Sequence, residues 1–136
     1  MSASRFEDPS DKHPIVHNNV ISNADPDIVV CYSDGFASPN PGPCGAAASL
    51  FFCKPDLVLD VGLSAGTGSN NIAELCGLFV CLSELIRVFH DRRFLKAIIF
   101  CDSRYALTLA SSSKVPGSNK ELVFSLRAVH STALSL

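Results

Sequence analysis

The chain has 136 residues, of which 47% are hydrophobic, with a mean hydropathy of +0.26 and a formal net charge of −2. This is an ordinary length for one domain, and it suffices to bury a core without disulfides or a structural metal. The slightly acidic balance argues against binding nucleic acid through a broadly cationic surface, so any such partner has to be engaged locally. No apolar run approaches the roughly 18 residues of a membrane span, so no membrane partner is expected.

The N-terminal segment, 1–26, is polar and has no sustained hydrophobic period. This predicts a flexible leader ahead of a domain at 27–136. Acids and a proline stand where a signal peptide needs an apolar segment, so we expect an intracellular protein. The six cysteines form no CxxC pair and lie mostly in apolar segments, which is typical of small buried hydrophobes rather than of ligands or disulfide partners.

An apolar run ends on an acid at Asp34. Residues 28–31 are β-branched or small, as in a strand buried on both faces, and the run continues to Asp34. Gly35 and the segment 40–43 then predict two turns. An ionised aspartate at the end of an apolar strand needs a partner, whereas an aspartate that caps an Asp-Gly turn would give the same local pattern. Other segments must decide between these interpretations.

Two further strands follow this turn. Residues 46–53 and 57–63 are predicted to be strands joined by a hairpin turn at 54–56. Three successive strands with short connections predict an antiparallel meander. The glycine- and serine-rich segment 64–69 is expected to be a flexible approach to the next element.

A long helix is predicted to begin after an N-cap at Asn70 or Asn71 and to run to about His90. This helix places Glu74 in its first turn, where the positive end of the helix dipole favours an anion. The prediction rests on apolar residues that recur at steps of three and four, namely Ile72, Leu75, Phe79, Leu82, Ile86 and Phe89.

A fourth strand within 94–100 again leads to an acid, Asp102, and a helix is predicted over 104–111. Because this strand follows a helix, a right-handed crossover returns it beside the first strand, with both carboxyl ends at one edge of the sheet. Asp34 and Asp102 are then neighbours, and Glu74 joins them if the long helix begins at that edge. Three converging carboxylates repel one another, and a divalent cation such as Mg²⁺ or Mn²⁺ relieves that repulsion.

Three segments carry a resemblance to a known family. YSDGFASPNPGPCGAAA resembles the first motif of type 1 ribonuclease H, SNNIAEL the second and FCDSRYAL the third, in the family's order. The resemblance covers residue 27 to the C-terminus and implies a ribonuclease H-like α/β domain of cellular or retroelement type. Such a domain has a mixed sheet of three antiparallel strands plus a parallel fourth, with helices on both faces.

The resemblance also implies an activity and the residues that carry it. Family members cleave the RNA strand of RNA/DNA hybrids with two Mg²⁺ ions held by an Asp-Glu-Asp-Asp set. Carried over by position, the catalytic acids are Asp34, Glu74 and Asp102, and Gly35 joins them as a metal-site residue. Contacts to the hybrid are implied for Gly35, Asn40, Ser69, Asn70, Asn71 and Arg104. Two departures are that Arg104 stands where the family commonly has glutamine and that Phe36 replaces a usually small residue.

The C-terminal stretch departs from the family. A break at 114–117 precedes a predicted helix over 119–134, and the family's fifth strand, its histidine-bearing loop and its final helix with the fourth aspartate have no counterpart. We therefore expect an incomplete domain whose activity is weak. The outer edge of the fourth strand, 97–100, is expected to be unpaired, which invites self-association or completion by another polypeptide.

Two classes of function remain open at this point. The first is endonucleolytic hydrolysis of the RNA strand of hybrids by two-metal-ion catalysis. The second is a non-catalytic ribonuclease H-like module that binds nucleic acid or protein. A DNA-cutting member of the same superfold, such as an integrase, also uses clustered acids but is disfavoured by the NPGPCG and NNIAEL segments.

Overall fold

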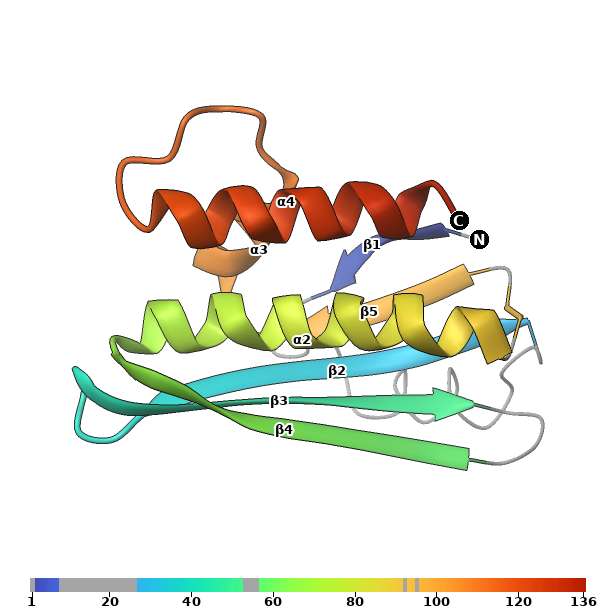
Figure 1. The fold of residues 1–136 in the computed structure, drawn as a ribbon, viewed down its shortest axis with the longest axis horizontal. Helices are drawn as coiled ribbons and strands as arrows, with labels where there is room; N and C mark the ends of the chain where they lie inside the picture. Colours follow the sequence, from blue (N-terminus) through green and yellow to red (C-terminus); the bar gives the residue numbers. More distant parts are fainter. Residues whose placement is uncertain (1, 8–26, 53–56, 92, 95) are drawn as a thin grey trace.

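The computed structural model describes residues 2–7, 27–52, 57–91, 93–94 and 96–136. The described strands form one five-stranded sheet with the order β1-β5-β2-β3-β4, and the described helices lie along it (Figure 1). The predicted turn at 54–56 lies outside the described residues. In chain order the elements are β1 (Ser2–Glu7), β2 (Ile28–Ala37), β3 (Gly42–Phe52), β4 (Leu57–Gly68), α2 (Asn70–Asp91), β5 (Lys96–Cys101), α3 (Arg104–Ser111) and α4 (Lys120–Leu134).

Strands β2 to β5 form the predicted mixed sheet. β2, β3 and β4 are an antiparallel meander, and β5 returns parallel to β2 after the crossover through α2. In this register Ser33 is paired with Cys101, which brings the carboxyl-terminal part of β2 beside the end of β5. The predicted arrangement of three antiparallel strands and a parallel fourth is therefore confirmed.

The outer edge of β5 is covered by β1. Ser2–Glu7 runs parallel to β5, with Arg5 in register with Ile98 and Glu7 with Phe100 (Figure 1). The expectation of an unpaired edge at 97–100 is wrong, because the N-terminal segment itself supplies the neighbouring strand. The same pairing places Ser2–Glu7, a part of the predicted leader, in the sheet. Self-association through this edge has no support from the described residues. Residues 8–26 lie outside the described part of the chain.

Strands β2 and β4 run further than predicted. β2 continues to Ala37 with Asp34 opposite Ala47, so this acid lies within the strand rather than at its end. The segment 64–69, predicted to be a flexible approach, is mostly the end of β4. In both places cross-strand hydrogen bonds outweigh the local turn preference of glycine.

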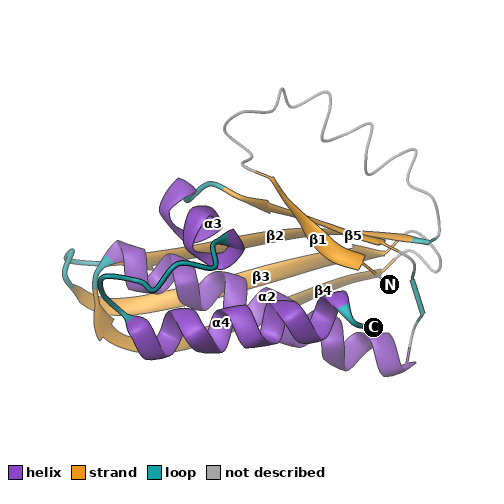
Figure 2. Ribbon diagram, turned by 90° about the horizontal axis from the view of Figure 1, so that it is seen from above, coloured by secondary structure: helices purple, strands orange, loops and turns teal. Residues whose placement is uncertain are grey.

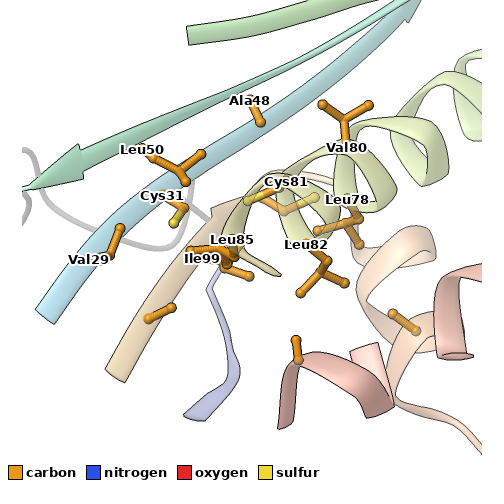
Figure 3. Packing of buried hydrophobic residues seen from close by; sticks show 14 of the residues in the cluster. Val29, Cys31, Ala48, Leu50, Leu78, Val80, Cys81, Leu82, Leu85 and Ile99 are labelled. Atoms are coloured by element: carbon orange, nitrogen blue, oxygen red, sulfur yellow. The ribbon is translucent and has the colours of Figure 1, made fainter. Parts of the chain in front are cut away.

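All three described helices pack on one face of the sheet (Figure 2). Alternation along β2 directs Val29 and Cys31 to the core beneath the helices, whereas Val30 joins a second cluster with Ile98 on the opposite face. Helices on both faces, as expected from the sequence, are thus not found in the described part of the chain. Figure 3 shows the core, in which the labelled residues include Val29, Cys31, Leu50, Leu78, Leu82, Leu85 and Ile99.

Helix α2 is the central element of this core. Of the predicted apolar stripe, Leu75, Leu82 and Phe89 are buried, while Ile72, Phe79 and Ile86 are half-buried. The buried arc is wider than one stripe because α4 packs alongside α2 and covers part of its surface (Figures 1 and 2). Among the described helices none combines the length and apolar character needed to cross a membrane.

Candidate metal centre

Two glycines let α2 approach β2 to backbone contact. A Cβ at Gly35 would lie 2.1 Å from the carbonyl oxygen of Ala73, and a Cβ at Gly77 would lie 2.6 Å from the carbonyl oxygen of Asp34. Main-chain atoms cannot move aside as a flexible side chain can, so both positions require glycine at this separation. The contact brings Glu74, which follows Ala73, against the strand that carries Asp34.

The N-terminus of α2 is capped by Ser69. The Ile72 N–H donates to Ser69 Oγ at 3.3 Å, and the Ala73 N–H donates to the Ser69 carbonyl at 3.1 Å. The predicted cap at Asn70 or Asn71 is therefore wrong, because the helix begins one residue earlier on a hydroxyl cap. Consequently Glu74 lies in the second turn, and the first turn contains no acid, so the expected first-turn dipole contribution does not apply.

Two asparagines join the β2–β3 loop to the start of α2. The Asn70 N–H donates to Asn40 Oδ1 at 3.1 Å, and the Ala37 N–H donates to Asn70 Oδ1 at 2.7 Å. Both asparagines are exposed, as is Asn71. The structure thus brings Asn40, Ser69 and Asn70 together at the start of α2.

The start of α3 adjoins Asp102, the third predicted acid. Ser103 caps this helix by accepting a hydrogen bond from the Ala106 N–H at 3.1 Å. The exposed Asp102 immediately precedes the cap, and the exposed Arg104 is the first helical residue. The cap therefore holds Asp102 and Arg104 at the end of β5.

Glu74 is the middle member of the three predicted acids. Burial is the largest cause that raises its pKa to about 8, and the negative charges of Asp102 and Asp34 raise it further. A hydrogen bond from the Gly35 backbone acts in the opposite direction, while a hydrogen bond with the Asp34 side chain favours the protonated form. The structure accordingly brings all three carboxyl groups together.

The donor set of this centre fits a hard divalent cation. Glu74 Oε2 is buried and has no hydrogen-bond partner among the described residues. This oxygen lies near two further carboxylates. Mg²⁺ and Mn²⁺ prefer oxygen ligands, and their positive charge offsets the repulsion between the three carboxylates.

Cys101 adjoins this centre, although its sequence context predicts only a small buried hydrophobe. The residue is buried, yet its Sγ and one carboxylate oxygen each of Glu74 and Asp102 lie within 4.8 Å of one another. Burial is the main cause that raises the pKa of the Cys101 thiol to about 11, while the nearby Ser103 main chain and Ser33 hydroxyl act in the opposite direction. The sequence feature that could have indicated this is the position of Cys101 directly before Asp102, at the end of the strand.

Phe36 lies close to the acids on the sheet surface and is 60% exposed. Its ring covers Gly45, where an added Cβ would lie 2.9 Å from the ring carbons. A shallow hollow beside the ring is lined by Asp34, Ala47 and Leu63, among others. The departure from a small residue at this position therefore places an aromatic face next to the acidic centre.

No protein-family model matches the chain, and no curated protein is significantly similar to it in sequence. Solved ribonuclease H structures are similar to it in fold. The N-terminal RNase H domain of a Mycobacterium tuberculosis protein, solved as a fusion with maltose binding protein, is 25% identical with a TM-score of 0.64, and the match covers 76% of this chain and 74% of that chain.

Two RNase H1 structures are similar at lower identity. LC11-RNase H1 in complex with an RNA/DNA hybrid is 19% identical with a TM-score of 0.64, over 79% of each chain. RNase H1 from the halophilic archaeon Halobacterium salinarum NRC-1 is 22% identical with a TM-score of 0.61, over 79% of this chain and 77% of that chain. With the mixed sheet and the three helices described above, these similarities identify the chain as a type 1 ribonuclease H-like domain in fold.

Proposed function

We propose that this protein is an endonuclease that hydrolyses the RNA strand of RNA/DNA hybrids with Mg²⁺ or Mn²⁺. The observation that carries the proposal is the gathering of Asp34 and Asp102 around the half-buried Glu74 carboxyl group. It is supported by the fold, since a structure of similar fold was solved with an RNA/DNA hybrid bound.

The three acids would hold the metal ions, and the Gly35 main chain adjoins them. Divalent ions bound there would supply an activated water and stabilise the leaving 3′-oxygen of a phosphodiester. The protein's own contribution is positional. Backbone contact at Gly35 and Gly77 fixes α2 against β2, so the carboxylates are already gathered before a substrate arrives.

The loop and helix start beside the acids would bind the hybrid. Amide and hydroxyl groups can hydrogen-bond the 2′-hydroxyls of an A-like strand, which separates RNA from DNA without reading the sequence. This role is supported by the hydrogen bonds that Asn40 and Asn70 make to each other's segments. Ser69 and Asn71 are the sequence neighbours of Asn70. The exposed Arg104 offers a local cation for a phosphate, which suits a chain whose net charge is −2.

The test compares an RNA/DNA hybrid with a DNA duplex of the same sequence at one salt concentration. We expect tighter binding of the hybrid and cleavage of its RNA strand alone, in Mg²⁺ or Mn²⁺. Asp102→Asn should reduce the cleavage rate by about a hundredfold or more, whereas Glu121→Gln, which removes an exposed acid from α4, should not.

Two results would count against this function. Equal affinity for hybrid and DNA duplex would remove the argument from 2′-hydroxyl recognition. Selective binding of the hybrid without cleavage in either metal would instead favour a non-catalytic binding module.

A further inference from the structure

A cysteine sulfur lies beside the acidic centre, and the proposed hybrid cleavage does not use it. Cys101 is the last residue of β5, and its Sγ lies within 4.8 Å of carboxylate oxygens of Glu74 and Asp102. Ligands of one Zn²⁺ ion stand about 2.0–2.3 Å from the metal, so small side-chain rotations would bring these three atoms to bonding distance. Asp102 is exposed, which leaves an entry path from solvent.

Two unsatisfied groups adjoin the same place. Ser33, the register partner of Cys101 on β2, is 6% exposed, and its hydroxyl has no hydrogen-bond partner among the described residues. As register partners on neighbouring strands, Ser33 and Cys101 lie side by side at this edge of the sheet. Glu74 Oε2 is likewise buried without a partner within the described ranges. Buried polar atoms without partners are uncommon in folded proteins and point to an absent ligand or ion.

Sulfur changes which metal this centre prefers. Thiolates bind thiophilic ions such as Zn²⁺ and Cd²⁺ much better than they bind Mg²⁺, which takes oxygen ligands almost exclusively. We propose that Cys101, Glu74 and Asp102 form a binding site for a thiophilic divalent cation, Zn²⁺ or Cd²⁺. Binding releases the thiol proton to the buffer and leaves one tetrahedral position for water.

Because this site shares Glu74 and Asp102 with the proposed Mg²⁺ centre, the two kinds of metal exclude each other. A thiophilic ion is therefore an inhibitor of hybrid cleavage, and excess Mg²⁺ lowers its apparent affinity. The inference goes beyond the proposed function, because binding through the sulfur requires neither a hybrid nor its hydrolysis.

The test titrates the full chain with Cd²⁺ and follows the ultraviolet absorption of the thiolate-to-metal charge transfer. We expect one ion per chain with this absorption, and Cys101→Ser should abolish the absorption and weaken Cd²⁺ binding at least tenfold while Mg²⁺ affinity stays within about twofold. The matched control is Cys81→Ser, since Cys81 is an equally buried thiol of α2 that adjoins Cys31 rather than the acids. This control should keep both the absorption and the affinity.

A second measurement covers the case in which Cys101→Ser does not fold. Cadmium NMR of the unaltered chain should give a resonance in the range of mixed sulfur and oxygen ligation, which an excess of Mg²⁺ diminishes. A resonance typical of oxygen ligands alone, or an absorption that Cys81→Ser removes, would overturn the inference. Neither result would count against Mg²⁺-dependent hybrid cleavage. Conversely, a protein that binds Cd²⁺ through sulfur but does not cleave hybrids in Mg²⁺ would refute only the proposed function.

Discussion

Gly77 of α2 packs directly against the main chain of Asp34, and a Cβ at this glycine would lie 2.6 Å from the Asp34 carbonyl oxygen. Glu74 is three residues earlier in α2, on the neighbouring turn of the same helix face. The distance between helix and strand at this contact therefore sets how closely the Glu74 carboxyl group can approach that of Asp34. A residue with no chemistry of its own thus controls the geometry of the acidic centre.

Gly77→Ala is expected to push α2 away from β2 and to destabilise the fold by about 1–3 kcal/mol, as overpacking usually does. Alanine's better helix propensity, worth about 1 kcal/mol, offsets only part of this. Urea unfolding measures the stability, and Mg²⁺ titration should show weaker binding. Gly117→Ala is the control, because nothing lies within 4 Å of a Cβ there. If Gly77→Ala is as stable as the unaltered chain and binds Mg²⁺ equally well, the contact does not control the centre.

The raised pKa of Glu74 predicts a pH-dependent stability in the absence of divalent cations. Between pH 4.5 and about 8 this carboxyl group is protonated in the folded chain and ionised in the unfolded chain. The folded state then binds more protons, so the free energy of unfolding falls as the pH rises through this window. Since the side chain is only half-buried, we expect a loss on the order of 1–2 kcal/mol.

Urea unfolding at about pH 5 and about pH 8 measures this dependence. Glu74→Gln should flatten it, because glutamine does not titrate, and saturating Mg²⁺ should raise the stability at the higher pH. An unaltered slope in Glu74→Gln would assign the pH dependence to other groups.

Asp34→Asn is expected to weaken Mg²⁺ binding by tenfold or more, because it removes a charge and an oxygen ligand from the centre. It should also lower the pKa of Glu74, since one of the repelling charges is lost. NMR titration with Mg²⁺ should perturb signals near residues 34, 74 and 102 in the unaltered chain. Glu121→Gln is the charge-matched control. Unchanged Mg²⁺ affinity in Asp34→Asn would mean that the metal site is wrongly placed.

Replacing Ser2–Glu7 by a glycine-serine segment of equal length is expected to remove β1 and expose the edge of β5. The apolar strand from Ala97 to Phe100 would then present unpaired backbone groups, which favour association. We expect a loss of about 1–3 kcal/mol in the free energy of unfolding, faster amide exchange in β5, and aggregates detectable by light scattering. Equal protection of the β5 amides in both chains would show that β1 does not stabilise this edge.

From residue 27 onward, the sequence by itself determined the kind and order of the elements. The signals are local, because each depends on side chains close together in the sequence. They are the strand composition, the three- and four-residue period of α2, and the acids Asp34, Glu74 and Asp102. The convergence of the three acids followed from the handedness of the crossover, which is a general property of parallel strands.

Only the tertiary structure decided the position of β1, the contact at Gly77 and the place of Cys101 beside the acids. Pairing of Ser2–Glu7 with β5 uses backbone hydrogen bonds between segments about ninety residues apart, and backbone groups are the same in every sequence. The need for glycine at 77 and the closeness of Cys101 Sγ to two carboxylates likewise depend on how far α2 lies from the sheet. That separation results from the packing of many side chains at once, so no single segment of the sequence encodes it.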